Sequence, residues 1–406
     1  MPFNASASSL VQLRYMEEAT WGTTPAAGPG AANLRMTGES LNIDRKKTAS
    51  EEIEASRQIS SLFVTDLQAN GGFNFELSYT EYDKLLAGLM MANWGTYGTN
   101  GVSGDLVGSL VVTDPNKDVL TFSAAPSGND ALANIAVGQW IRLGAGGTGS
   151  APTAVNLGVR RVLAKTGTVL ELEKATGGVA DTTKTFKIYA QRVTHGTTKK
   201  SFTLEKAFTD VGQIFYYRGM MVSKMSLSMK GGAAVTGSFD FLGRDGGRVT
   251  STTLPGTIAA SASNPVISAV TGVKNVRMAG QDVNTRYQTY LRELTLDYDN
   301  ALGGLDALGQ LGNVGVRLGT IGLKGSFQAY LNDGSMYDDF INSITQSLSF
   351  ILVDSLGQGY AITLTNIDME TVKVVAGKKD ESVLLEVNWT ALKEASSGQS
   401  MFIDKL

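Results

Sequence analysis

The chain is poor in the residue types that carry covalent and catalytic chemistry. It has no cysteine among its 406 residues, which excludes disulfides and thiolate metal sites. Its single histidine, His195, stands in a polar stretch between Thr194 and Lys200, so we expect a solvated linker residue rather than the base of a Ser-His-Asp triad. The sequence therefore predicts no catalytic residue, no metal site and no cofactor.

Charge and long apolar runs are also scarce. Charged residues make up 18% of the chain and the net charge is −3, which argues against broad electrostatic capture of nucleic acid but is compatible with a surface past which DNA slides. The longest apolar run, 85–94, is too short to span a bilayer, and the first ten residues lack the basic and apolar parts of a secretory signal. We expect a soluble protein made in a cytoplasm, with no membrane partner.

Glycine, in contrast, is abundant. The chain has 47 glycines and 42% apolar residues, and stretches of Gly, Ser, Thr and Asn separate short apolar runs throughout. This pattern is typical of a many-turned, mainly β protein with enough apolar material for buried cores in two or three domains.

The most informative feature is an internal repeat. Gly71, Phe73 and Leu77 recur as Gly325, Phe327 and Leu331 at an offset of 254 positions, and Thr80, Tyr82 and Asp83 recur as Ser335, Tyr337 and Asp338 at an offset of 255. In each copy a strand-like alternation of apolar and polar residues is followed by the spacing of a capping box, with Asp in place of Glu. We expect a helix of about three turns in each copy, near 80–93 and near 335–346.

Matching strands follow each predicted helix. They are 201–207, 214–217, 222–230 and 233–242 in the first copy, and 347–353, 360–365, 369–375 and 382–392 in the second. Glycine-containing turns at 231–232 and 377–378 fall in equivalent hairpins. The sequence therefore predicts a module of hairpin, strand, helix and four strands that occurs twice.

Two segments interrupt this pattern. Between about 97 and 190, six strand-like runs separated by glycine-rich turns predict a small β-barrel inserted at a surface turn of the first module. Residues 244–281 are rich in Ser, Thr, Ala and Gly and predict a linker. The predicted domains are a first module at 1–96 and 191–243, the inserted domain at 97–190, the linker at 244–281 and a second module at 282–406.

Motifs that resemble catalytic sites have structural explanations. Residues 144–149 fit G-x-G-x-x-G, but no helix follows, which indicates a flexible turn rather than a dinucleotide site. The pairs Asp297/Asp299 and Asp338/Asp339 lie on the polar face of a predicted strand and in the first turn of a predicted helix, where carboxylates are favourable. An enzyme of the alternative kind, a glycan hydrolase that uses paired carboxylates, would need such acids in a concave site.

Two dissimilar loops occupy equivalent places in the two modules. The first is basic and then acidic, and its charged residues are Arg45, Lys46, Lys47, Glu51, Glu52, Glu54 and Arg57. It predicts a long hairpin, although a simple solvated loop would have the same composition. The second, 301–311, carries Leu302, Leu305 and Leu308, and exposed leucines need a partner to cover them. Together the loops indicate self-assembly, with these ten residues as candidate contacts.

Several segments resemble one family. The runs LRYMEEATWGTTP at 13–25 and LRMTGESL at 34–41, the charged hairpin, and GGFNFEL at 71–77 before a helix resemble the tail tube (major tail) proteins of long-tailed, non-contractile bacteriophages. The inserted segment, with VGQWIRL at 137–143 and GTVLEL at 167–172, is similar to the small β domain often found within such proteins.

The resemblance implies a fold and a mechanical function. Each module would have two packed antiparallel β-sheets and a flanking helix, and the modules would assemble into stacked rings whose inner strands close a wide β-barrel. A long loop reaches from each ring to its neighbour, and by position Asp44–Arg57 matches that loop. The protein would be a conduit for genome ejection without enzymatic activity, located in the virion tail after assembly in the host cytoplasm. Implied partners are a tape-measure protein and genomic DNA in the lumen, and tail terminator and tail tip proteins.

The duplication adds a prediction about stoichiometry. Usual members of the family supply one module per subunit to a hexameric ring, whereas this chain contains two. Three chains would then complete a ring, which favours a trimer with pseudo-sixfold symmetry over a hexamer. A virion-surface or baseplate β-rich binding module is the alternative, and it would remain a discrete oligomer.

Overall fold

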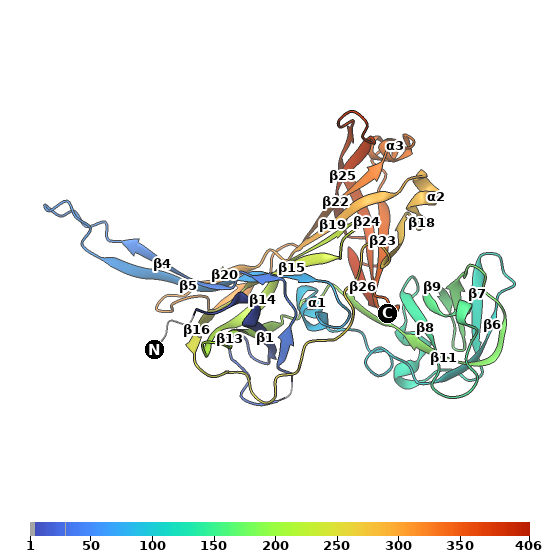
Figure 1. Cartoon of the computed structure of the whole chain (residues 1–406), viewed down its shortest axis with the longest axis horizontal. Helices are drawn as coiled ribbons and strands as arrows, with labels where there is room; N and C mark the ends of the chain where they lie inside the picture. Colours follow the sequence, from blue (N-terminus) through green and yellow to red (C-terminus); the bar gives the residue numbers. More distant parts are fainter. Residues whose placement is uncertain (1–4, 29) are drawn as a thin grey trace.

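The structure, a computed structural model, describes residues 5–28 and 30–406. It is mainly β, with strands β1 to β26 arranged as one 18-stranded sheet, a closed six-stranded barrel and a two-stranded sheet. Figure 1 shows two β-rich halves at the centre, the barrel at one side and a long hairpin that projects on the opposite side. The expected mainly β fold with an inserted barrel is confirmed.

The first half consists of two sheets that share one long strand, β14 (Gln213–Lys230). The N-terminal part of β14 pairs with β13 (Ser201–Phe208) and β16 (Asp245–Val249), and its C-terminal part pairs with β15 (Thr236–Leu242). Beside β13 lie β1 (Val11–Glu18) and then β2 (Ala32–Leu34); beside β15 lies β5 (Leu62–Glu76), and beside β5 lie β3 (Gly38–Glu39) and β4 (Asn42–Ala49). Because the chain switches sheets within β14, the two sheets enclose a core between them.

The second half repeats this arrangement around β24 (Gly359–Val375). The N-terminal part of β24 pairs with β23 (Gln346–Val353) and β26 (Met401–Lys405), and its C-terminal part pairs with β25 (Leu384–Leu392). The remaining strands are β17 (Val273–Met278) beside β23, β18 (Gln281–Asp282) beside β17, β22 (Gly322–Tyr330) beside β25, β19 (Leu291–Asp299) beside β22, and β12 (Gln191–Thr194) beside β26.

Irregularities in the strands show that the two halves follow the same path. The β14–β15 register shifts between Val222 and Lys224, and the β24–β25 register shifts between Met369 and Thr371. Val222 and Met369 differ by 147 positions, and so do Lys224 and Thr371. A β-bulge bends and twists its strand in a defined way, so a bulge at equivalent places indicates one duplicated architecture.

The two equivalent helices are shorter than expected, and their capping is different. α1 (Asp83–Leu89) and α3 (Ser335–Ile341) have seven residues each, or two turns, and the short α2 (Val283–Tyr287) precedes β19. The prediction of two capping boxes is wrong. The Asp83 carboxylate accepts hydrogen bonds from Tyr360 Oη and Lys405 Nζ, each at 2.6 Å, instead of from its own helix.

At α3 the capping carboxylate comes from outside the predicted box. The Ser335 amide and hydroxyl donate to Asp333 Oδ1 at 3.0 and 2.6 Å, while Asp338 stays exposed. Four 3₁₀ turns complete the helical structure: Ser8–Leu10, Gly128–Asp130, Leu132–Asn134 and Ala154–Asn156.

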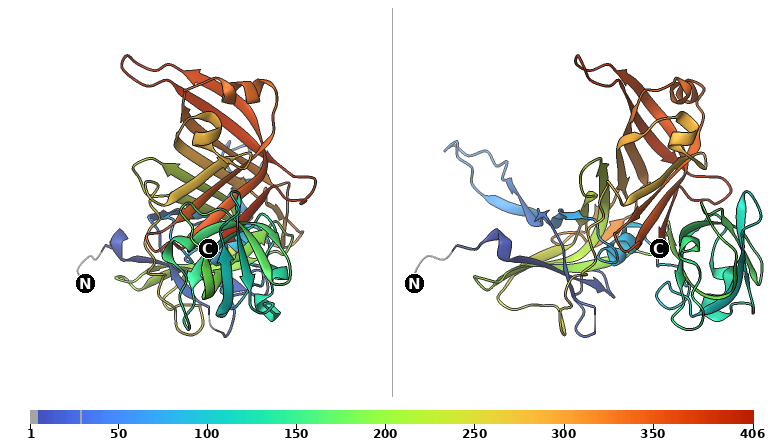
Figure 2. Two further views of the ribbon diagram at one scale, coloured as in Figure 1. Left: turned by 90° about the vertical axis from the view of Figure 1, so that its right-hand side faces the viewer. Right: turned by 45° about the vertical axis from the view of Figure 1, so that its right-hand side comes forward.

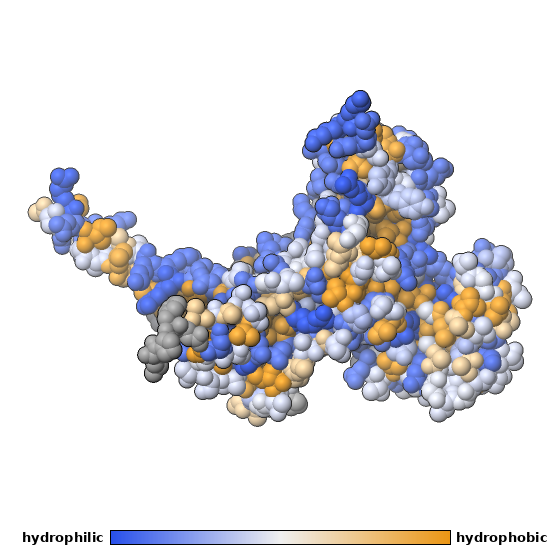
Figure 3. Space-filling model, viewed as in Figure 1, coloured by the Kyte–Doolittle hydropathy of each residue, from blue (hydrophilic) through white to orange (hydrophobic). Residues whose placement is uncertain are grey.

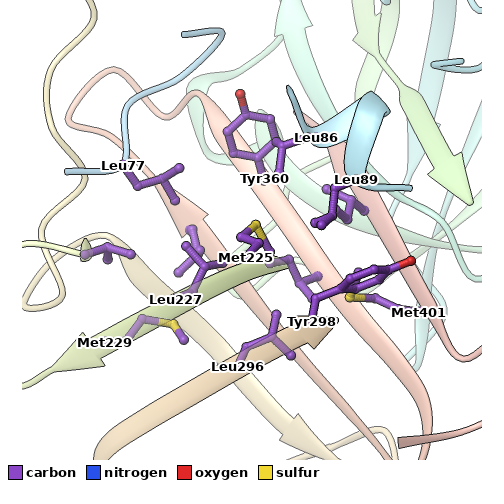
Figure 4. Close-up of a cluster of buried hydrophobic side chains, with 14 of the residues drawn as sticks. Leu77, Leu86, Leu89, Met225, Leu227, Met229, Leu296, Tyr298, Tyr360 and Met401 are labelled. Carbon is purple, nitrogen blue, oxygen red and sulfur yellow. The ribbon is translucent and has the colours of Figure 1, made fainter. Parts of the chain in front are cut away.

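The two halves are joined by a continuous sheet and a shared core. β14 of the first half pairs with β19 of the second from Lys224–Asp299 to Lys230–Glu293. Figure 4 shows the side chains beneath this junction, where Leu86 and Leu89 of α1 lie over Met225 and Tyr360. One hydrophobic cluster therefore extends through both halves.

The inserted barrel has a core of its own. Its strands, in the order β10-β7-β6-β11-β8-β9, are β6 (Leu106–Val111), β7 (Lys117–Phe122), β8 (Trp140–Ala145), β9 (Gly158–Lys165), β10 (Val169–Glu173) and β11 (Asp181–Tyr189). It contacts the second half through Trp140, which packs on Ile351 and Val353 and whose amide donates to buried Asp404 at 3.0 Å. Arg192 completes this contact with an ion pair of 2.6 Å to Asp404. Figure 2 shows the barrel beside this half from two further directions.

The segment 244–281, predicted as a linker, also supplies strands to both halves. β16 extends the first half beside β14, and β17 extends the second half beside β23. The Ser-, Thr- and Gly-rich composition describes the coil between them, residues 250–272, better than it describes the strands. The overall composition of 244–281 gave no sign of the two short strands near its ends.

The repeated glycines Gly71 and Gly325 serve different purposes. Gly71 adopts φ +98°, where a side chain is strained, and an added Cβ would lie 2.2 Å from the Ser40 carbonyl oxygen. At Gly325 an added Cβ would lie 2.2 Å from the Thr295 carbonyl oxygen of the neighbouring strand and 2.2 Å from the ring of Trp389, which is fully buried. The second glycine therefore makes room for an indole that fills the core of the second half.

We predict that Gly325→Ala destabilises the protein by about 1–3 kcal/mol, because both the Trp389 ring and the Thr295 backbone have to move in a close-packed core. The measurement is the free energy of unfolding in urea. Gly334→Ala is the matched control, since no atom lies within 4 Å of its added Cβ. Equal stability of the two variants would show that the ring has free space to move.

Candidate assembly surfaces

The charged segment forms a ribbon that leaves the body of the molecule. β4 and β5 pair from Asn42–Asn70 to Ala49–Leu62, and residues 50–61 form the tip (Figure 1). All seven predicted charged residues are exposed, and Lys46 pairs with Asp66 of the opposite strand at 3.0 Å. An isolated two-stranded ribbon is marginally stable in water, so this hairpin gains from contact with another surface.

The same hairpin exposes apolar residues that the charge pattern concealed. Ile53 is fully exposed at the tip, and Ile59, Leu62 and Phe63 are more than half exposed. Apolar side chains held away from any core of their own chain indicate a docking surface. Their presence between charged residues was visible in the sequence, but only the ribbon geometry shows that the chain itself cannot cover them.

The leucine loop is the structural counterpart of the charged hairpin. It connects β19 to β22, the equivalents of β4 and β5, and contains the small sheet of β20 (Gly303–Leu305) and β21 (Gly315–Arg317). Leu305 and Leu308 are exposed, the latter fully. Leu302, expected among the exposed leucines, instead packs on the cluster of Met91, Met221 and Val316 and anchors the loop.

Both loops lie on the same side of the molecule. At Gly312 a Cβ would meet the Leu67 carbonyl oxygen at 2.5 Å, so the loop lies directly against the base of the hairpin. The Asn313 amide group also donates to the Gly243 carbonyl at 3.2 Å. The two loops thus adjoin at the base of the hairpin. We call hairpin residues 45–63 and loop residues 305–311 together the stacking surface.

The sheet shared by the two halves has a polar outer face. Along β14, Ser226 and Ser228 alternate with buried Met225 and Leu227, and the other strands show the same period. Exposed or half-buried carboxylates on this face are Glu76, Asp240, Glu293, Asp297, Asp299, Glu370 and Glu386; the lysines are Lys224, Lys230, Lys324 and Lys373. The space-filling view in Figure 3 shows hydrophilic residues spread over the visible side of both halves.

Some of the charged residues on this face form ion pairs between neighbouring strands. Lys224 lies 3.0 Å from Asp299 across the junction of the two halves, and Lys324 lies 3.5 Å from Glu370. Burial raises the pKa of Asp297. Carboxylates outnumber lysines among these residues, so the face presents no excess of lysine charge to phosphate groups.

His195 is not the solvated linker residue that was expected. Its ring is half-buried, with Nδ1 2.9 Å from Tyr298 Oη and Nε2 2.9 Å from Ser400 Oγ. Burial lowers the pKa of His195 to about 4. The polar neighbours in sequence gave no sign of these partners, which lie about 100 and 200 positions away.

The other motifs considered for catalysis are engaged in structural contacts. In loop 144–149 the amides of Gly147 and Thr148 donate to the Asp105 carboxylate at 3.0 and 2.9 Å. No helix begins within this loop. Asp339 accepts from Arg286 and from Tyr287 Oη. Within 5–28 and 30–406, no group of three or more His, Cys, Asp or Glu side chains is arranged to hold a metal ion, and the helices are all too short or too polar to cross a membrane.

A family model described as phage tail tube protein matches residues 8–391, which is nearly the whole chain. A search of curated proteins finds no match.

We predict that His195 makes folding pH-dependent. Its folded pKa of about 4 lies below the usual 6.5, so the unfolded chain binds the extra proton and stability falls as pH decreases from about 6.5 to 4. His195→Gln should remove this contribution, of the order of 2 kcal/mol. Chemical denaturation of both proteins at pH 7 and pH 4.5 measures the difference, and parallel losses of stability in the two would contradict it.

Proposed function

Because the chain belongs to the phage tail tube protein family, and is therefore a structural component of a phage tail, we propose that it polymerises into stacked rings that form the conduit for genome ejection. The observation that carries this proposal is the continuous ladder from β4 through β5, β15, β14, β19, β22 and β25 to β24. This sheet is polar on one face and packed on a core at the other. Repeated around an axis, it closes into a wide barrel without free edges.

The ring contains three chains in this proposal. Each chain supplies two equivalent four-strand sectors, and the ladder between them shows how neighbouring sectors join. Three chains therefore supply six sectors, giving a trimer with pseudo-sixfold symmetry. The first module would comprise 1–96 and 191–243 and the second 282–406, with the barrel of 97–190 attached to the outside of every second sector.

The polar face lines the lumen in this arrangement. Serine, threonine and asparagine side chains with a small excess of carboxylates offer DNA no array of cations, so the genome passes without being retained. The tape-measure protein occupies the same channel before ejection. Terminator and tail tip proteins bind the two ends of a tube that assembles in the host cytoplasm and functions in the virion.

The stacking surface connects successive rings. Its hairpin reaches far beyond the body of its own chain (Figure 1) and combines exposed charges with exposed isoleucines. Apolar contact would supply affinity and the basic-then-acidic order would supply orientation, because complementary charges suppress wrong registers.

The first experiment tests the ring. Purified protein is concentrated and imaged by negative-stain microscopy, and the rings are weighed by native mass spectrometry. The expected result is hollow tubes whose rings have the mass of three chains. Rings of six chains would contradict the stoichiometry, and discrete oligomers without tubes would favour the surface or baseplate binding module instead.

The second experiment tests stacking. Replacing Glu51, Glu52 and Glu54 by Lys should shorten or abolish tubes, because the tip then carries a single sign of charge, while the circular dichroism of the protein stays unchanged. Replacement of the same residues by Gln is the graded control and should shorten tubes less. Unchanged tube length in the lysine variant would remove the hairpin from the contact between rings.

A further inference from the structure

The junction between the two halves of one chain is a template for a junction between two chains, because a single chain leaves the equivalent strand edges unpaired. Inside the chain, β14 pairs with β19 so that Met225 opposes Tyr298 and Leu227 opposes Leu296. Equivalent bulges relate β14 to β24, which makes Val372 the counterpart of Met225 and Val374 the counterpart of Leu227. Residues 368–375 of β24 pair with β25 on one edge, and no described strand pairs with the other edge.

The counterpart of β19 is equally open. β19 lies beside β22, with Leu294 opposite Phe327. In the first half, β3 and β4 lie beside β5, with Glu39 opposite Phe73, the equivalent phenylalanine. Leu41 and Ile43 are therefore the counterparts of Leu296 and Tyr298, and the only strand partner of β3 and β4 among the described residues is β5.

The edge of the second half formed by α3 and residues 368–375 of β24, which we call the open end, carries apolar side chains like those of the internal junction. At the open end these side chains are exposed to solvent. On α1, Leu86 and Leu89 are 5% and 0% exposed, whereas their counterparts, Ile341 at the end of α3 and Ile344 just after it, are 59% and 44% exposed. Three further pairs behave in the same way, each with the first residue buried and the second exposed: Leu77 and Leu331, Tyr82 and Tyr337, Leu227 and Val374. Figure 3 shows apolar residues among the polar ones near α3, at the upper end of the view.

Because α1 and α3 are equivalent helices, the surface that covers α1 indicates the kind of surface that would cover α3. The helix α1 lies against the sheet of the second half, where Tyr360, Ile362 and Met401 share its core and Tyr360 bonds Asp83. The equivalent sheet of the first half carries Phe208 and Phe215, which are half-buried and in contact with each other at a ring distance of 5.8 Å. Arg248 and Gln213 lie beside them on β16 and β14, and the exposed Asp338 of α3 has the charge to meet Arg248.

We infer that the open end of the second half binds the first half of another copy, with β24 pairing antiparallel to β3 and β4 in the register of β14 and β19. Val372 then opposes Ile43 of the second copy, Lys373 opposes Asn42 and Val374 opposes Leu41. The apolar face of α3 covers Phe208 and Phe215 of that copy. This inference rests on the proposed ring and names the strands, register and side chains that close it.

A side-chain bond protects the open edge in the single chain. The Leu41 amide donates to Glu39 Oε2 at 3.0 Å, and the Leu41 carbonyl accepts from Tyr217 Oη at 3.1 Å and from Lys206 Nζ at 3.2 Å. Lys206 also holds Glu39 at 3.1 Å. Such a bond satisfies an edge amide that would otherwise pair with any extended strand. A carbonyl of β24 replaces the Glu39 carboxylate when the second copy binds.

The absence of cysteine allows a direct test by engineered disulfides. Asn42→Cys combined with Lys373→Cys places two thiols opposite each other only between copies. Ser226→Cys combined with Asp297→Cys does the same at the internal junction and is the positive control. Asn42→Cys combined with Val375→Cys is the register control, since a slip of two residues moves the thiols about 6.6 Å apart along the strand.

Each double variant is assembled at the concentration that gives wild-type tubes, oxidised mildly and resolved on a non-reducing denaturing gel. The in-register pair should give covalent oligomers that end in a closed species of three chains, the internal control a monomer of changed mobility, and the register control mostly uncross-linked chains. Tubes without cross-links in the first variant, or equal cross-linking in the register control, would overturn the inference while leaving the proposed function intact. Cross-linked closed oligomers of the first variant, with no tubes formed by either the variant or the wild-type protein, would retain the pairing and refute the tube.

Discussion

The antiparallel ladder between β14 and β19 is the contact on which the rest of the architecture depends. It turns two sandwich-like halves into one sheet, and side chains alternate across that sheet, so it separates a polar face from a continuous core. A slip of one residue would expose Met225, Leu227 and Met229 and bury the serines between them, which fixes the register strongly. The orientation of α1, the position of the polar face and the placement of both loops at one side follow from this register.

The same sequence elements have different surroundings in the two halves, and the difference is informative. Leucines of α1 are buried because the second half lies over them, whereas the equivalent isoleucines at and just after the end of α3 have no such cover. The sequence has apolar residues at equivalent positions of both helices, although only one helix is buried within the chain. In the assembly that we propose, the solvent exposure of α3 would describe the isolated chain rather than the surface that remains after assembly.

Much of the fold could be predicted from the sequence because local periodicity reflects it. The alternation around Phe73 and Phe327, the two helices and the inserted barrel are signals within 10–20 residues. The failures concern partners far apart in the chain. Asp83 has cap spacing but bonds Tyr360 and Lys405, His195 looks solvated but lies between Tyr298 and Ser400, and Leu302 looks exposed but packs on Met91. The charged residues predicted the hairpin. Only the structure, in which the hairpin projects away from the body of the molecule, shows that the side chains of Ile53 and Phe63 are exposed.

The covalent connection between the halves has a kinetic consequence. Two binding partners on one chain meet at an effective concentration that the connecting segment sets, commonly in the millimolar range, whatever the concentration of the protein. In a ring of three chains, alternate junctions therefore form during folding, as unimolecular events, and only the remaining ones require collision. Fewer collisions make ring closure less steeply dependent on protein concentration than it is for six separate subunits, so duplication lets rings start to form while the protein is still dilute.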